Sequence, residues 1–256
     1  VQVPADGFGN CIHLWERECS IQRRHQKLIE EAPCAFLEET TRLRMCEQAV
    51  ALARAAGYRS AGTVEFLVGA DGAFHFLEMN TRLQVEHPVT ECVTGIDLVE
   101  QMIRVAAGER LAFDQAQVQR RGWAMECRVN AEDPARGFLP SSGRLVRYQP
   151  PEQTLWASQA VASTEGVRVD GGVREGDVVS SYYDPLLAKL IVHGRNRDDC
   201  IRTMQEALDA FLIRGVSTNL TFHAAMLAHP DFRAARFTTA FVAEHHDGGV
   251  AAAPDP

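Results

Sequence analysis

The feature that most constrains the fold of this chain is an Asp-Gly pair between two runs of strand-forming residues, "TVEFLV" and "FHFLEMN". An Asp-Gly pair flanked by such runs is the strongest short-range signal for a β-hairpin. A two-residue turn at Asp71 and Gly72 sets Glu65 directly opposite Glu78. The segment 63–80 is therefore predicted to be a hairpin that carries two facing carboxylates.

Two directly opposed carboxylates repel each other, or raise one another's pKa, because their Cβ atoms lie about 5 Å apart. A divalent cation bound between Glu65 and Glu78 removes this conflict. Mg²⁺ prefers hard oxygen ligands, commonly one or two carboxylates together with substrate phosphates. The same register pairs Asn80 with Thr63, so Asn80 offers one more oxygen. The alternative interpretation is a solvated polar face on an edge hairpin, since exposed glutamates are common.

Polar side chains continue after the hairpin. Counting by twos from Glu78, the chain carries Asn80, Arg82, Gln84 and Glu86. In an extended strand these alternate side chains share one face. Arg82 suits an anionic ligand, because its planar guanidinium presents a fork of donors. An extended chain puts Glu86 about 20 Å beyond Asn80. We therefore expect Glu86 to act as a separate base, with Pro88 ending the strand.

A basic cluster stands upstream, in "CSIQRRHQKLIEEAP", and consists of Arg23, Arg24, His25 and Lys27. In a chain of net charge −8 this local reversal favours a patch for phosphate or another small anion. The alternative is a surface loop balanced by Glu30 and Glu31. Acidic metal ligands and an anion patch together indicate nucleotide-phosphate chemistry. The chain nevertheless has neither a GxxxxGKS/T phosphate loop nor a GxGxxG motif.

The composition argues against several other classes of function. A net charge of −8 is unfavourable for binding nucleic acid, which requires a basic surface. No apolar run is long enough to span a bilayer, and "VQVPADGFGN" lacks the features of a secretion signal. None of the seven cysteines belongs to a CxxC pair, which argues against a zinc site or a disulfide framework. These features favour the cytoplasm, or the mitochondrial matrix in a eukaryote.

Hydrophobic periodicity and turn residues predict an α+β fold. The predicted helices are 39–56 with Gly57 as its stop, the segment "GIDLVEQMIRVAAGERL" with Gly108 as its stop, 197–213 and 218–229. The predicted strands are 1–5, 11–15, the hairpin, and the runs "WAMECRVNAED", "GRLVRYQP", "VRVDGGV" and "LLAKLIVHG".

The pattern changes near residue 110, and 256 residues suffice for two ordinary domains. We expect a first domain over 1–110, in which strands and helices alternate. A second domain over 111–246 is expected to be a mixed antiparallel sheet with helices. The tail 247–256 is expected to be disordered.

The chain also contains "ERECSIQRRHQKLIEEAP", "EFLVGADGAFHFLEMNTRLQVEHPVTECVTGIDLVEQMIRVAAGERL" and "MECRVNAEDP". These stretches closely resemble biotin carboxylase, the ATP-grasp component of biotin-dependent carboxylases. The string "EMNTRLQVEHPVTE" is highly specific, because other ATP-grasp ligases keep only a looser Glu-x-Asn-x-Arg pattern. The resemblance implies the C-terminal half of an ATP-grasp fold, followed by a biotin carboxylase C-terminal domain. Downstream, "SYYDPLLAKLIVHG" and "IRGVSTN" look like acyl-CoA carboxylase α subunits, such as that of propionyl-CoA carboxylase.

The resemblance implies a role for each matching residue. Residues that match magnesium and nucleotide ligands are Glu65, Glu78 and Asn80, and further nucleotide contacts match Gln22 and His25. Residues that match the bicarbonate site are Lys27, Arg82, Gln84 and the backbone of Val85. Glu86 matches the general base that deprotonates bicarbonate. Arg82 also matches a position beside the biotin ureido group, and Arg128 matches an arginine that stabilises the biotin enolate.

The implied reaction uses ATP as a substrate, Mg²⁺ or Mn²⁺, and biotin carried on another domain or chain. Bicarbonate attacks the γ-phosphate of ATP to give carboxyphosphate, which breaks down to CO₂ and phosphate. The phosphate takes the N1′ proton of biotin, and the enolate captures CO₂. Implied partners are a biotin carboxyl carrier domain, a carboxyltransferase subunit and further copies of the parent chain. Nucleic acid and membrane are not expected partners.

The resemblance further implies that an N-terminal domain and a glycine-rich lid lie outside this sequence, and no Ala-Met-Lys-Met biotinylation motif occurs in it. We therefore expect the isolated chain to hold much of the site but to turn over poorly or not at all. Two alternatives stay open: another ATP-grasp ligase, such as one of the carbamoyl-phosphate type, or a non-catalytic assembly fragment. Glu86 and Arg128 discriminate, because a generic ligase does not require them.

Overall fold

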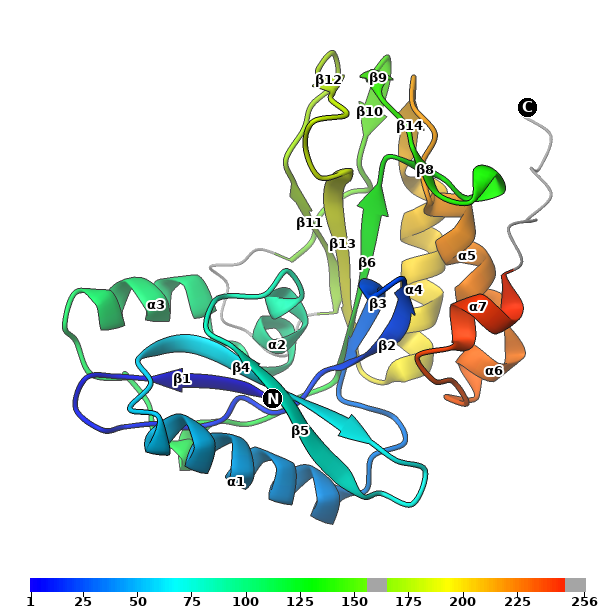
Figure 1. The fold of residues 1–256 in the computed structure, drawn as a ribbon. Helices are drawn as coiled ribbons and strands as arrows, with labels where there is room; N and C mark the ends of the chain where they lie inside the picture. The colour runs from blue at the N-terminus through cyan, green and yellow to red at the C-terminus, as the bar shows by residue number, and fades with distance from the viewer. Residues whose placement is uncertain (156–164, 247–256) are drawn as a thin grey trace. The chain divides into compact units, whose positions relative to one another are not determined.

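The computed structural model describes residues 1–155 and 165–246 (Figure 1). The tail predicted at 247–256 lies outside the described residues. Within these ranges, helices combine with antiparallel sheets, which confirms the predicted α+β class. None of the helices in the described part is both long enough and apolar enough to cross a membrane.

The elements follow one another along the chain with these bounds. The strands are β1 (Gln2–Ala5), β2 (Glu18–Arg23), β3 (Gln26–Ala32), β4 (Ser60–Val68), β5 (Phe74–Asn80), β6 (Trp123–Asn130), β7 (Glu132–Asp133), β8 (Leu139–Pro140), β9 (Gly143–Arg144), β10 (Arg147–Gln149), β11 (Gly166–Gly171), β12 (Val178–Val179), β13 (Leu186–Gly194) and β14 (Leu212–Arg214). The helices are α1 (Glu39–Ala55), α2 (His87–Thr94), α3 (Leu98–Ala106), α4 (Arg197–Ala210), α5 (Leu220–Ala228), α6 (Pro230–Arg233) and α7 (Phe241–His245), with short 3₁₀ helices η1 (Gln115–Gln117) and η2 (Pro134–Arg136).

The described residues form two compact units. Unit 1 contains Val1–Glu18 and Glu31–Ala124, and unit 2 contains Cys19–Glu30 together with 125–155 and 165–246. The chain thus leaves unit 1 for most of the β2–β3 hairpin and then returns to it. The division into functional domains near residue 110 stays a prediction.

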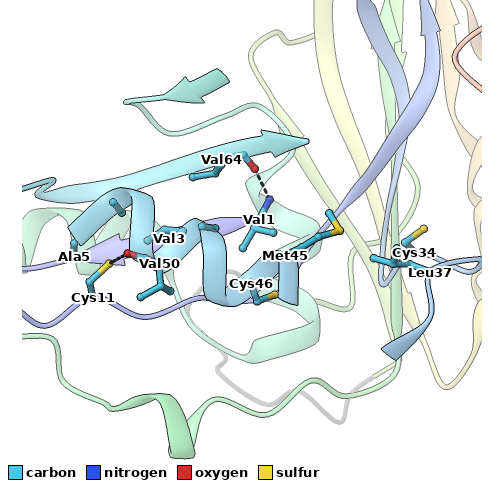
Figure 2. Close-up of a cluster of buried hydrophobic side chains, with 12 residues drawn as sticks. Val1, Val3, Ala5, Cys11, Cys34, Leu37, Met45, Cys46, Val50 and Val64 are labelled. Atoms are coloured by element: carbon cyan, nitrogen blue, oxygen red, sulfur yellow. Dashed lines mark hydrogen bonds between the residues drawn. The ribbon is translucent and has the colours of Figure 1, made fainter. Parts of the chain in front are cut away.

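The three-stranded sheet of unit 1 has the order β1-β4-β5, and one of its faces is covered by α1. Met45 and Val50 lie on the buried side of α1. They belong to one apolar cluster with Val3 of β1 and Val64 of β4 (Figure 2). Gly57 follows α1 with a φ of +60°, which confirms the predicted stop. The apolar residues of α1 therefore define which face of the sheet is buried under it.

The other face of that sheet carries Ala61 of β4, which is buried in a second cluster with Leu98 of α3. Side chains alternate along a strand, so Glu65 shares the face of Ala61, whereas Val64 points towards α1. Helix α3 ends before Gly108, whose φ is +85°, as predicted. The sheet therefore presents Glu65 on the face away from α1.

The β4–β5 hairpin has the predicted register at its functional end, where Glu65 pairs with Glu78. The turn itself is not the predicted two-residue one. The loop has three residues, 70–72, because the backbone N–H of Gly69 donates to the carbonyl of Ala73. Leu77 has no partner in β4, and this bulge shifts the register by one residue. The longer loop and the bulge cancel, so the two carboxylates still face each other.

The largest sheet to which unit 2 contributes has five strands in the order β11-β13-β6-β3-β2. The predicted strand "LLAKLIVHG" is β13, and its middle residues are buried. Helix α4 packs beside it (Figure 1) and is capped by Asn196, whose side chain accepts the backbone N–H of Asp199. Helix α4 ends at Ala210 rather than at residue 213, because Leu212–Arg214 form β14 and pair with β10.

Two further predictions of secondary structure are wrong. The segment 11–15 is not a strand, and Cys11 forms only an isolated bridge with Ala5. Pro88 does not end a strand but lies in the first turn of α2. Proline suits that position because its missing N–H has no partner within the helix anyway.

Candidate functional site

Two carboxylates and an amide converge on the β4–β5 hairpin, towards the end that lies away from its turn. Glu65 and Glu78 are directly opposed, and Asn80 pairs with Thr63 further along. The Nδ2 atom of Asn80 donates to Oε1 of Glu78 at 2.9 Å and to Oε1 of Glu65 at 3.3 Å. The positive end of the amide dipole thus lies between two carboxylates, where a cation would also relieve their repulsion.

This donor set fits Mg²⁺, which prefers carboxylate and amide oxygens. Rotation of its terminal amide turns the oxygen of Asn80 towards the carboxylates, since the two ends of an amide have nearly the same shape. Glu78 is exposed and Glu65 is half-buried, so phosphate oxygens and water can complete the octahedral shell from the solvent side. The residues present are therefore able to hold the ion.

The polar residues beyond Asn80 do not continue as a strand, contrary to the prediction. Strand β5 ends at Asn80, and the following residues lead through a turn into α2. Gln84 is buried, and its Nε2 donates to Oε1 of Glu65 at 2.6 Å. The expected separation of about 20 Å between Asn80 and Glu86 requires an extended chain. It does not apply, because the chain after Asn80 is not a strand and Gln84 contacts Glu65 of β4.

Glu86 directly precedes α2 and is 2% exposed. The turn that leads to it is closed by His87. Its ring Nδ1 lies 2.8 Å from the carbonyl oxygen of Gln84, and its backbone N–H donates to the same oxygen at 3.3 Å. Glu86 therefore stands on a segment that is fixed at both ends. Within this segment Arg82 is exposed, with one N–H donor bonded to the carbonyl of Leu83 at 3.3 Å.

Arg17 also contacts this segment, through Gln84 and Thr90. It was not identified from the sequence. Its Nη2 donates to the side-chain oxygens of Gln84 at 2.8 Å and Thr63 at 3.0 Å. Its Nη1 donates to the side-chain oxygens of Gln2 and Thr90, each at 2.8 Å. A single arginine in "ERECS" carries no spacing signal, because its four acceptors are distant in the sequence.

The β2–β3 hairpin of unit 2 carries the predicted nucleotide and bicarbonate contacts. Arg24 and His25 form its two-residue turn, are exposed, and have φ of +50° and +66°. Left-handed backbone of this kind costs an L-residue about 1–2 kcal/mol. Gln22 and Lys27 lie within two residues of the turn and are half-buried. The hairpin therefore holds His25 at its tip, with Gln22 and Lys27 below it.

Arg23 of the predicted basic cluster is half-buried, as Lys27 is, and contacts the segment 137–138. Its Nη2 donates to the carbonyl of Gly137 at 2.7 Å, and its guanidinium carbon lies 4.5 Å from the ring centroid of Phe138. Burial lowers the pKa of Arg23, and the neighbouring Arg24 adds to this effect. The turn at Arg24 and His25 is at the surface, but the alternative that Glu30 and Glu31 balance it there is wrong, since both are buried.

Arg128 lies on β6 and is paired with the buried Glu30 of the neighbouring strand β3. Its Nε and Nη2 lie 2.7 Å and 2.5 Å from Oε1 of Glu30. The backbone carbonyl of Arg128 accepts bonds from Nδ2 of Asn219 at 2.9 Å and from the ring Nε2 of His223 at 2.8 Å. Burial lowers the pKa of His223 to about 4, so its ring is neutral. Arg128 is therefore held through both its side chain and its backbone.

Among the described residues, one group of three histidine and acidic side chains lies close enough to hold a metal ion, and it belongs to unit 2. These residues are His229, Asp231 and His245. Nδ1 of His229 accepts the backbone N–H of Asp231 at 3.2 Å, and Arg236 donates to Oδ1 of Asp231 at 2.7 Å. These contacts cap α6, so we assign the group to the structure of unit 2.

The sequence matches two family models. Residues 1–113 match the ATP-binding domain of the carbamoyl-phosphate synthase L chain. Residues 126–244 match the biotin carboxylase C-terminal domain. The two matches cover the parts of the chain that hold the hairpin carboxylates and Arg128, respectively.

The chain is also similar to characterised proteins. It is 55% identical to the propionyl-CoA carboxylase alpha chain of Ruegeria pomeroyi over 258 residues, which cover 97% of this chain and 38% of the relative. It superposes on a biotin carboxylase complex from Campylobacter jejuni with a TM-score of 0.89 and 46% identity, over 96% of this chain and 52% of that one.

A further similar structure is the biotin carboxylase domain dimer of Hydrogenobacter thermophilus 2-oxoglutarate carboxylase, in complex with MgADP, ADP and bicarbonate. The TM-score is 0.89 at 44% identity, over 95% of this chain and 51% of that one. The chain therefore spans 38% of the curated relative and about half of each solved structure. The fold, the two domain matches and these similarities agree: the chain belongs to the biotin carboxylase family and corresponds to the C-terminal half of the biotin carboxylase component.

Proposed function

We propose that the protein containing this chain carboxylates biotin with ATP and bicarbonate, within an acyl-CoA carboxylase. One observation carries the proposal. The chain that follows Glu78 folds so that Gln84 bonds Glu65, the opposed carboxylate, and it then leads directly to the buried Glu86. A generic ATP-grasp ligase requires the opposed pair only. The continuation through Gln84 to a buried carboxylate adds an acceptor site and a base to the nucleotide site.

In the proposed reaction Glu65, Glu78 and Asn80 hold Mg²⁺ against the phosphates of ATP. The ion, when bound, neutralises charge on the transferring phosphoryl group. Lys27, Arg82, Gln84 and the backbone of Val85 hold bicarbonate. Glu86 removes its proton, and a bicarbonate oxygen then attacks the γ-phosphorus as ADP leaves. Positioning and cationic stabilisation carry such a transfer.

The carboxyphosphate so formed breaks into CO₂ and phosphate, and the phosphate removes the N1′ proton of biotin. Arg128 stabilises the enolate and Arg82 lies beside the ureido group of biotin, where both guanidinium groups stay charged at any working pH. N1′ then attacks CO₂ to give carboxybiotin. Gln22 and His25, near the tip of the β2–β3 hairpin, contact the nucleotide in this proposal. The pairing of Arg128 with Glu30 supports a fixed position for the guanidinium.

The proposal includes partners and location. Biotin arrives on a carrier domain of the same or another chain, and a carboxyltransferase subunit passes the carboxyl group to an acyl-CoA. The parent protein is proposed to be oligomeric and to reside in the cytoplasm, or in the mitochondrial matrix in a eukaryote. Residues 1–110 are assigned to the ATP-grasp domain and 111–246 to the C-terminal domain.

A second candidate is a ligase of the carbamoyl-phosphate type, favoured by the family match of residues 1–113. The two are distinguished in an extended chain, in which this sequence is preceded by the N-terminal part of a biotin carboxylase. Biotin carboxylation predicts phosphate release from MgATP that requires bicarbonate and rises with free biotin. Release that is indifferent to biotin but rises with an amine acceptor contradicts the proposal. The isolated chain is expected to show little or no turnover.

A further inference from the structure

Arg17 links three stretches of unit 1 that are far apart in the sequence, around Gln2, around Thr63 and between Gln84 and Thr90. Gln2 belongs to β1, Thr63 to β4, Thr90 to α2 and Gln84 to the turn before α2. Each side-chain oxygen lies between 2.8 and 3.0 Å from a terminal nitrogen of Arg17. Each terminal nitrogen of a guanidinium carries two hydrogens, so the four acceptors use all four terminal hydrogens of Arg17.

These contacts determine which way round the amide of Gln84 stands. Its Oε1 accepts from Nη2 of Arg17 at 2.8 Å, and its Nε2 donates to Oε1 of Glu65 at 2.6 Å. A flipped amide would set its NH₂ group against the guanidinium and its oxygen against the carboxylate. Both contacts would then be repulsive, so only one orientation is compatible with Arg17 and Glu65 together.

The orientation decides what Gln84 can bind. With its oxygen held by Arg17, the amide presents only N–H donors on the side of Glu65. One of the two hydrogens of Nε2 bonds Glu65, so the second can serve another acceptor. A donor in this place suits an anion, whereas an amide oxygen would repel one.

A second cycle of bonds keeps Arg17 itself in place. The hydroxyl of Thr63 accepts from Arg17 and lies 3.4 Å from Oε1 of Gln2, which also accepts from Arg17. Nε2 of Gln2 donates to the carbonyl of Gly62 at 2.8 Å. Gln2 and Thr63 are buried, so their positions are fixed by the β1–β4 pairing.

We propose that Arg17 is a positioning residue that sets Gln84 as a donor and anchors the start of α2, so that the segment up to Glu86 is prepared to receive bicarbonate. This inference rests on the proposed function. It adds a residue that acts through Gln84 and is not proposed to contact ATP or bicarbonate. Arginine is required rather than any cation, because two terminal nitrogens serve acceptors on two sides. A lysine presents a single nitrogen.

The kinetic test uses Arg17→Met and Arg17→Lys in the extended chain. Loss of an outer partner of this kind commonly weakens binding by about tenfold to a hundredfold. We expect both variants to raise the KM for bicarbonate by such a factor and to change the KM for ATP less. An Arg17→Lys variant with the KM of the unaltered chain would contradict the proposal, since charge alone would then suffice.

Arg42→Met is the matched control. Arg42 is buried, whereas Arg17 is half-buried, and Arg42 bonds Glu16 at 2.7 Å and the carbonyl of Cys34 at 2.9 Å rather than Gln84. This control is expected to lower thermal stability without raising the KM for bicarbonate. An equal rise of that KM in Arg42→Met would assign the effect of Arg17 to stability alone and overturn the inference.

A second readout does not depend on activity. In the isotope-labelled chain, NMR resolves the side-chain NH₂ signals of glutamines, and the Gln84 pair is assigned by its loss in Gln84→Ala. We expect this pair to be strongly shifted and slow to exchange, and to move to the position of a solvated amide in Arg17→Met. Unchanged signals overturn the inference, whatever the kinetics show. If the extended chain ignores bicarbonate but the signals collapse, the proposed function fails and the role of Arg17 in orienting Gln84 stands.

Discussion

At the scale of single residues, the site depends on two like charges that the fold sets directly opposite each other. Glu65 and Glu78 face each other, and the side-chain amides of Asn80 and Gln84 donate to their carboxylates. Dipoles screen such a pair less well than a cation does. The arrangement costs stability in the absence of metal and gains it when metal and phosphate bind.

Replacing one of these carboxylates should therefore move stability and binding in opposite directions. Glu78→Gln removes a like-charge contact, so we expect the metal-free chain to gain up to about 1 kcal/mol of unfolding free energy. In the extended chain we expect the same change to weaken Mg-nucleotide binding by about tenfold or more. Urea unfolding and calorimetric titration measure the two effects.

The control for this prediction is Glu47→Gln, which removes one negative charge from an exposed position of α1. It should change neither quantity measurably. If Glu78→Gln destabilises the metal-free chain and leaves nucleotide binding intact, the carboxylate pair is a structural feature and not a metal site.

The pair Glu65 and Glu78 could be predicted from the sequence, because strand pairing has a simple arithmetic and the Asp-Gly signal is strong. The role of Arg17 could not, because it arises from four contacts between distant parts of the chain. The pairing of Arg128 with Glu30 could not be predicted for the same reason, because the two residues lie on β6 and β3, far apart in the sequence, and Glu30 is buried.

At the scale of elements, the β4–β5 hairpin shows that a wrongly predicted turn can still leave the functional residues correctly paired. In β4–β5 a longer loop and a bulge cancel, so a register predicted from the wrong turn is right where the carboxylates lie. After Asn80 the polar alternation suggested a strand, but the chain turns to bury Gln84 and start α2. Tertiary contacts of Gln84 with Arg17 and Glu65 outweigh the local pattern there.

The β2–β3 turn allows binding to be separated from backbone strain. Arg24 and His25 both have left-handed backbone, which glycine adopts without a steric penalty. Arg24→Gly and His25→Gly should each raise the unfolding free energy by about 1 kcal/mol. In the extended chain, only His25→Gly should weaken ATP binding. Thermal unfolding and nucleotide titration give the two readouts, and equal loss of ATP affinity in both variants would show that the turn, not His25, contributes the contact.

At the scale of the whole molecule, two buried histidines couple folding to pH. Burial lowers the pKa of His13 in unit 1 and of His223 in unit 2 to about 4, from an ordinary 6.5. The unfolded chain therefore binds protons before the folded chain does as the pH falls. Stability is complete above the ordinary value and is lost progressively as the pH falls from about 6.5 to about 4.

For His223 alone, linkage gives a loss of the order of 2 kcal/mol between about pH 7.5 and about pH 5. His223→Gln keeps a donor for the carbonyl of Arg128 but does not titrate, so its stability should depend less on pH over this range. Urea unfolding at several pH values tests this expectation. An identical pH slope in the variant would show that His223 is not protonated on unfolding.

The measurement that tests the central claim most directly is phosphate release from MgATP by the extended chain and by its Glu86→Gln variant, with and without bicarbonate and free biotin. Release by the unaltered chain is expected to require bicarbonate and to rise with biotin. Glu86→Gln is expected still to bind nucleotide but to lose this release, because no carboxylate remains to deprotonate bicarbonate. Undiminished bicarbonate-dependent release in Glu86→Gln would contradict the assignment of the base, and release independent of bicarbonate and biotin would contradict the proposed reaction itself.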